Sequence, residues 1–238
     1  MSRSSLWAQR TIFDVMKEMI RELVSMTEQE WGTYAFSRDP IHKRVSTDLR
    51  REMIQSANRC GREEAQKLQK RFGQQDITQL VAALGLNINR EDSFGVDNFI
   101  TFAQFHSPNS ITLFMGNVTA TQDLILEHDM GEMLQYVDVE QLLTAHEMFH
   151  FIEEETPTLY TRTTRIDLWG VGRLRYKSGL ICLGEIAAMA FAAEMLHLNY
   201  SPYVFDVLLP WSKNEIQSRK LYQDILQFKN VKGEEKNG

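Results

Sequence analysis

Five consecutive residues, His146-Glu147-Met148-Phe149-His150, combine two imidazoles with one carboxylate. On a helix the two histidines lie four residues apart and therefore on one face, so both can reach the same metal ion. Glu147 projects close by and can take a proton from a metal-bound water. This H-E-x-x-H pattern is typical of zinc metallopeptidases, and it predicts hydrolysis by a metal-activated water with Glu147 as general base.

The residues around the motif predict the helix that this geometry requires. Apolar residues recur at helical spacing on both sides of the motif, and acidic residues occupy the first turn. The predicted helix runs from Asp138 to Glu155 and ends before the breaker Thr156-Pro157. The alternative interpretation is that both histidines are polar residues on a partly exposed helix face.

A catalytic zinc also needs a third protein ligand and an open position for water. The acidic and histidine candidates downstream are Glu153, Glu154, Glu155, Asp167, Glu185, Glu194 and His197. Glu154 continues the motif helix and would lie about 12 Å from His146 along the axis, too far to share one ion. Glu185 is the lone acid in the apolar stretch 180–192, where an unpaired charge is costly to bury. It is therefore the favoured third ligand, and a solvent-facing Glu185 is the alternative.

The composition limits the classes of function. The chain has 238 residues, 43% of them hydrophobic, and a net charge of −6, which argues against a dedicated nucleic-acid binder. Cys60 and Cys182 form no C-x-x-C pair, which fits a reducing cytoplasm. Neither an export signal nor a run of about 18 apolar residues is present. We expect a soluble cytoplasmic protein without direct nucleic-acid or membrane partners, and its oligomeric state stays open.

The predicted elements give an α+β fold class that is mainly helical. Helices are expected at 5–31, 46–72 with Gly61 as a candidate break, 77–84 between the cap Asp76 and Gly85, 121–136, 138–155, 179–197 and 213–228, and a loop at 32–40. Strands are expected at 86–89, 98–105 and 109–115. They should form a small antiparallel three-stranded sheet packed by the H-E-x-x-H helix. The expected organisation is an N-terminal helical region 1–75, a motif-bearing domain 76–228 and a disordered tail 229–238.

The segment between the two ligand helices, from Pro157 to Ser178, has no clear period. Its basic residues are Arg162, Arg165, Arg173, Arg175 and Lys177, against the single acid Asp167. One interpretation is a solvated surface loop. The other is a basic substrate lip or lid beside the active site, because long ordered loops are often functional.

Beyond the motif, the chain resembles the ImmA/IrrE family of metallopeptidases. The resemblance covers about residues 76–197, and the matching residues are Glu185-x-x-Ala188-x-x-Phe191-Ala192-x-x-Met195-Leu196, Ile77-x-x-Leu80-x-x-x-Leu84-Gly85-Leu86-x-Ile88 and Ser110-Ile111-Thr112-Leu113. The chain departs from the family at Met148-Phe149, where Leu-Gly is frequent, and at Met189, where Asn is common. It also places the closing proline at Pro202 and has a longer segment between His150 and Glu185. No departure removes a ligand.

The resemblance implies a zincin-like, gluzincin-type core. One Zn²⁺ per chain, or another divalent metal, would be held by His146, His150 and Glu185, with Glu147 as the base. The implied substrate is a regulatory protein such as a transcriptional repressor, cleaved or inactivated in stress response or mobile-element control. An oxyanion donor is also needed, and Tyr160, Tyr176, His106 or an arginine of the basic segment could serve.

Two other classes of function stay open. Glu147-x-x-His150 and Glu194-x-x-His197 are two Glu-x-x-His pairs, as in di-metal carboxylate helical bundles. That site also needs glutamates from two further helices, for which Glu18, Glu22, Glu127 and Glu132 are available. The strand-like block 86–115 argues against a simple bundle. The third class is a non-catalytic zincin-like fold that binds a partner protein, although the presence of both histidines and both glutamates argues against it.

Overall fold

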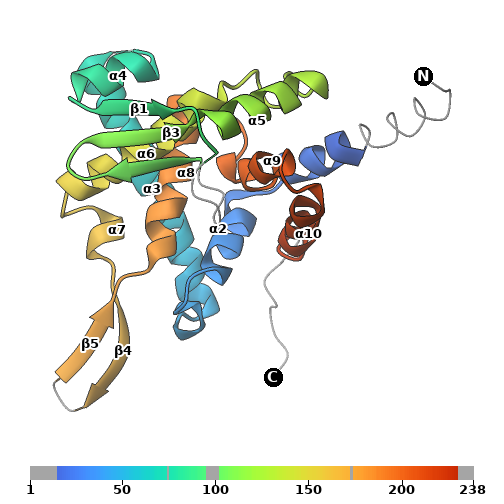
Figure 1. Cartoon of the computed structure of the whole chain (residues 1–238). Helices are drawn as coiled ribbons and strands as arrows, with labels where there is room; N and C mark the ends of the chain where they lie inside the picture. Colours follow the sequence, from blue (N-terminus) through green and yellow to red (C-terminus); the bar gives the residue numbers. More distant parts are fainter. Residues whose placement is uncertain (1–14, 74, 95–101, 172–173, 230–238) are drawn as a thin grey trace, which may run out of the picture.

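A computed structural model of the chain describes residues 15–73, 75–94, 102–171 and 174–229. The helices are α2 (Glu28–Ser37), α3 (Thr47–Phe72), α4 (Ile77–Ala83), α5 (Met115–Glu127), α6 (Val139–Glu155), α7 (Tyr160–Thr163), α8 (Ile181–Met195), α9 (Phe205–Trp211) and α10 (Glu215–Leu226), with 3₁₀ turns η1 (His42–Arg44) and η2 (Pro202–Val204). The strands are β1 (Asn87–Glu91), β2 (Ala103–His106), β3 (Ser110–Phe114), β4 (Ile166–Val171) and β5 (Leu174–Ser178). The fold is therefore mainly helical with a small three-stranded sheet (Figure 1), as the α+β class predicts.

The sheet is mixed, so the prediction of an antiparallel sheet was wrong. Its order is β1-β3-β2, with β3 in the centre, parallel to β1 and antiparallel to β2. The short turn 107–109 forces β2 and β3 into a hairpin. The connection between β1 and β2 is longer, so β1 is not forced into a hairpin with β2. It pairs with the free edge of β3 and runs in the same direction as β3. The first part of the predicted second strand, 98–101, lies outside the described residues.

The motif helix forms as the sequence predicts. Asp138 caps α6 by accepting a hydrogen bond from the Gln141 amide, 2.9 Å away. Its apolar face is buried and includes Leu142, Ala145 and Phe149. The helix packs against β2 and β3 on one side and against α8 on the other. The residues of the H-E-x-x-H motif therefore lie mid-helix, between the sheet and α8.

Helix α3 lies against α8 over much of its length (Figure 1). The two backbones come very close at Gly61, where an added Cβ would lie 2.0 Å from the carbonyl oxygen of Ala187. The sequence indicates Gly61 as a candidate break, but α3 continues through it without interruption. Gly61 allows α8 to approach, and Ser46 caps α3 through the Leu49 amide.

The N-terminal predictions were partly wrong. Residues 15–24 are helical, but the chain bends at 25–27 and a new helix begins because Thr27 and Glu30 form a capping box. Helix α2 then occupies most of the predicted loop 32–40. The described residues on both sides of position 75 share one hydrophobic core, from Met16 to Ile225, and the boundary between 1–75 and 76–228 stays a prediction. The predicted disordered tail 229–238 lies, except for residue 229, outside the described residues.

The basic segment is not a loop. It contains the short helix α7 and the antiparallel hairpin β4–β5, which projects from the body of the molecule (Figure 1). Trp169 and Tyr176 lie on neighbouring strands and stack with ring centroids 6.3 Å apart, and both are exposed. A register shift between Asp167 and Trp169 interrupts the alternation of side chains in β4, so the sequence of this strand shows no clear period.

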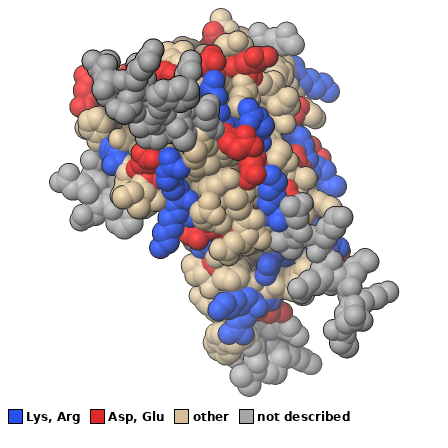
Figure 2. All heavy atoms as spheres, turned by 90° about the vertical axis from the view of Figure 1, so that its right-hand side faces the viewer, with Lys and Arg blue, Asp and Glu red and all other residues tan. Residues whose placement is uncertain are grey.

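The charge of the surface and the length of the helices concern the expected absence of nucleic-acid and membrane partners. Basic and acidic side chains are interspersed over the face seen in Figure 2. Within the described ranges, none of the helices combines the length and the apolar character needed to cross a membrane.

Candidate metal centre

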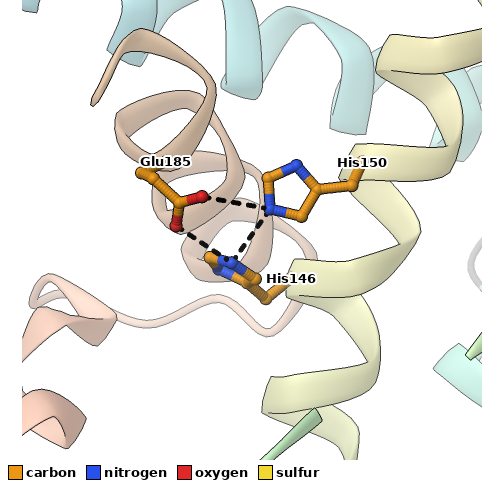
Figure 3. A group of neighbouring side chains, drawn as sticks. All are labelled: His146, His150 and Glu185. Carbon is orange, nitrogen blue, oxygen red and sulfur yellow. Dashed lines mark hydrogen bonds and ion pairs between the residues drawn. The ribbon is translucent and has the colours of Figure 1, made fainter. Parts of the chain in front are cut away.

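Two helices bring together the three side chains that the sequence favours as metal ligands. His146 and His150 project from α6 toward Glu185 on α8 (Figure 3). The Nε2 atoms of the two histidines are 3.2 Å apart. The Glu185 carboxylate oxygens lie 3.5 Å from His146 Nε2 and 3.6 Å from His150 Nε2. One ligand atom from each residue thus lies within 4.8 Å of the others.

This arrangement fits a zinc ion. With Zn–N and Zn–O bonds of about 2.0–2.1 Å, tetrahedral ligand atoms lie about 3.4 Å from one another, close to the three separations observed here. Two imidazole nitrogens with one carboxylate oxygen are a donor set of catalytic zinc sites. The three protein ligands leave a fourth position, and the Glu185 side chain is 43% exposed. The residues present therefore fit a metal ion that also binds a small molecule.

The electrostatics of the group favour a positive charge at its centre. Burial alone would lower the pKa of His146, but hydrogen bonding to and the charge of Glu185 raise this pKa to about 9. Burial alone would raise the pKa of Glu185, but the two histidines lower it to about 2. In the metal-free protein a proton on His146 takes the place that a cation would take.

Glu153 orients the His150 ring from its Nδ1 side, opposite the metal-binding nitrogen. Its carboxylate lies 3.5 Å from Nδ1, the ring nitrogen that does not face Glu185. Burial raises the pKa of Glu153, yet hydrogen bonding to His150 brings the pKa below its usual value. A carboxylate on the second nitrogen fixes the tautomer and orientation of a ligating histidine. Sequence reasoning considered Glu153 only as a ligand, although its position three residues after His150 could have indicated this role.

Glu147 lies between the metal ligands and the sheet. It is buried, and its Oε2 accepts a hydrogen bond of 2.7 Å from the backbone N–H of Phe105 in β2. The Phe105 ring also contacts Phe151 on α6, with centroids 6.1 Å apart. The edge strand of the described sheet and the motif helix thus hold this carboxylate in place.

A cavity of about 580 Å³ opens beside the ligands. His146, Glu147 and Glu185 line it. Much of the remaining wall is apolar and includes Leu143 and Met189. A site of this size and character can take part of a peptide, with the polar groups gathered at the metal ligands.

The N-terminal region and the segment after α8 complete the cavity wall. Arg38 donates from Nη1 to Asp206, at 2.9 Å, and to the hydroxyl of Tyr34, at 3.0 Å. Tyr34 also donates to Asp206, at 2.9 Å. Arg38, Asp206 and Tyr203 line the cavity together with His146 and Glu185. Sequence reasoning missed all of these residues, because nothing in their local pattern points to the site.

The predicted oxyanion donors lie elsewhere. Tyr176 is on the projecting hairpin, Tyr160 begins α7 and His106 is the exposed last residue of β2. The described lining of the cavity includes none of the three. Their role stays a prediction that the geometry does not favour.

The second Glu-x-x-His pair does not join the group. Glu194 accepts a hydrogen bond of 2.9 Å from Gln66, and His197 is exposed just after α8. Among the residues that the structure describes, only His146, His150 and Glu185 form a cluster of three or more metal-ligating side chains. The geometry therefore offers no support for a second metal position.

Comparisons of the chain with models of protein families, with curated proteins and with solved structures gave no match. The resemblance to the ImmA/IrrE family stays a prediction. Any function proposed for the chain therefore depends on the geometry of the site.

Proposed function

We propose that this protein is a zinc-dependent metallopeptidase. One observation carries the proposal: the ligand atoms of His146, His150 and Glu185 converge within 4.8 Å of one another, beside a cavity that His146, Glu185 and Glu147 line. Three ligands, an open position and an adjacent carboxylate are what hydrolysis by an activated water requires.

Each residue has a separate task. A zinc ion held by His146, His150 and Glu185 would supply a water that can lose its proton near neutral pH and would polarise the carbonyl of the bond to be cleaved. Glu147 takes that proton and passes it to the departing amine. The Phe105 amide anchors one of its carboxylate oxygens, which leaves the other oxygen for the proton. Glu153 keeps His150 in the orientation needed for ligation.

The substrate best suited to the cavity is an extended peptide with an apolar side chain beside the cleaved bond. The Phe105 amide points away from β3 toward Glu147. Ala103, two residues earlier in the strand, presents its backbone to the same side and lines the cavity. A peptide can pair with such a strand edge through its own backbone. A regulatory protein such as a repressor, which the family resemblance implies, would have to present such a segment.

The first test is the metal content of the purified protein, together with cleavage of a synthetic peptide library read by mass spectrometry. We expect about one zinc per chain and cleavage that a chelator abolishes and added zinc restores. About two irons or manganese ions per chain would instead favour the di-metal class. Protein that binds no zinc after incubation would contradict the proposal.

Glu147→Gln tests the catalytic role separately from metal binding. The glutamine oxygen can still accept from the Phe105 amide, so zinc content should be kept, while kcat falls at least about 100-fold because the base is lost. Glu154→Gln is the matched control, because Glu154 is exposed on the same helix and lies outside the cavity lining. Equal activity of Glu147→Gln and the control would exclude Glu147 as the base.

A further inference from the structure

Tyr203 has a rigid, buried place in the wall of the metal cavity. It lies in η2, which packs directly against α8, the helix that carries Glu185. Its ring stacks on Trp31, with centroids 5.7 Å apart and an interplanar angle of 18°. The ring of Tyr34 meets it edge-on at 5.9 Å. Only 5% of Tyr203 is exposed, so the position of its hydroxyl is determined by packing.

The hydroxyl of Tyr203 is buried and has no hydrogen-bond partner within the described part of the chain. A buried polar group without a partner costs free energy, so native proteins keep few of them. Burial is the main cause that raises the pKa of this hydroxyl well above its usual value, and the negative charge of Glu185 is the second cause. The hydroxyl therefore stays protonated and is available as a donor.

The neighbouring carboxylates differ in how well they are supplied with donors. Asp206 already accepts from Tyr34 and Arg38. Asp39 accepts from the backbone amides of Ile41 and Cys182.

Glu185 interacts with the Nε2 atoms of His146 and His150. Both of these nitrogens would bind the metal ion and would no longer donate to Glu185. Once an ion is bound, the Glu185 carboxylate is therefore the one of these three acceptors to which the described residues supply no further donor.

We propose that Tyr203 is a positioning residue of the metal centre, whose hydroxyl donates a hydrogen bond to the Glu185 carboxylate when the ion is bound. This inference rests on the proposed zinc site. A ligating carboxylate is normally held by such an outer hydrogen bond, and its loss typically weakens metal binding about 10- to 100-fold. Because solvent does not reach the hydroxyl, support of the ligand fits better than direct contact with a substrate.

Tyr203→Phe tests the proposal, because it keeps the ring between Trp31 and Tyr34 and removes only the hydroxyl. The dissociation constant for zinc is measured by competition with a chromophoric chelator, on the full chain. We expect zinc binding about 10- to 100-fold weaker than in the wild type. The melting temperature of the metal-free variant should be unchanged, because the hydroxyl has no partner to lose.

Tyr200→Phe is the matched control. The Tyr200 hydroxyl donates to the carbonyl oxygen of Leu134, at 3.0 Å, and Tyr200 lies outside the lining of the metal cavity. This variant should lower the melting temperature and keep zinc affinity, the opposite of Tyr203→Phe. In the cobalt-substituted protein, the visible absorption spectrum should change for Tyr203→Phe and stay constant for Tyr200→Phe.

The outcomes separate this inference from the function on which it rests. Wild-type protein that binds no zinc would overturn both. Wild-type protein that binds zinc, with equal affinity and an equal cobalt spectrum in Tyr203→Phe, would overturn the role of Tyr203 alone. Unchanged zinc affinity with lost turnover would also overturn it, because the hydroxyl would then act on the reaction and not on the ligand.

Discussion

The Nε2 atoms of His146 and His150 lie 3.2 Å apart, with their ring planes inclined at 74°. Two neutral nitrogens that both offer lone pairs at this distance would repel each other. A cation between them, or a proton on one of them, turns the repulsion into attraction. Glu185 faces both nitrogens, so its negative charge favours a cation or a proton at this position.

Zinc binding should become tighter as pH rises. In the metal-free protein the pKa of His146 is raised to about 9, so zinc has to displace a proton from it at neutral pH. The affinity should increase about tenfold per pH unit from pH 6.5 and level off above pH 9. Competition with a chelator whose own protonation is known, between pH 6.5 and 8.5, measures the slope. A flat profile would show that His146 is not protonated in the metal-free protein.

The stability of the metal-free protein should show the reverse trend. The folded pKa of His146 lies above its unfolded value of about 6.5, so its contribution is complete below that pH and is lost as pH rises through about 9. Glu185 has a folded pKa of about 2, below its unfolded value, so its contribution is lost as pH falls toward 2. Chelator-treated protein should therefore melt at a lower temperature at pH 9 than at pH 6, by more than His146→Gln does. Equal pH dependence in both proteins would assign the effect to other groups.

Glu153→Ala should weaken zinc binding without removing a ligand. Glu153 holds the Nδ1 side of His150, and loss of such a partner typically costs about 10- to 100-fold in metal affinity. The zinc dissociation constant is the measurement. Glu155→Ala is the control, because Glu155 is exposed at the end of the same helix. A Glu153→Ala variant that matches this control would show that His150 is oriented by packing alone.

Asp39→Ala should lower the free energy of unfolding by about 1–3 kcal/mol. Asp39 is buried and accepts from the Cys182 amide in the first turn of α8, at 3.1 Å, and from the Ile41 amide, at 3.0 Å. Its loss leaves the buried Cys182 amide and the partly buried Ile41 amide without their acceptor. Urea unfolding measures the change, with Asp224→Ala, at an exposed position of α10, expected to stay within about 0.5 kcal/mol of the wild type. A loss no larger than that of the control would show that water replaces the carboxylate.

The sequence alone determined the local parts of the site. The apolar period around His146 and His150 predicted a helix from Asp138 to Glu155, and α6 spans Val139–Glu155 with Asp138 as its cap. The lone acid in an apolar stretch indicated Glu185 on the next helix. The helix prediction is confirmed because helix formation and the placement of residues four apart depend on neighbours in the chain.

Only the tertiary structure decided the parts that come from distant segments. The parallel pairing of β1 with β3 depends on how the chain crosses between strands, which the strand patterns do not encode. Arg38, Asp39 and Tyr203 reach the cavity because α2, α8 and η2 pack against one another. Close packing at Gly61 sets how near α3 comes to α8. The contacts of Arg38, Asp39 and Gly61 join residues more than a hundred positions apart. Their cause is the burial of complementary surfaces, which no local period reveals.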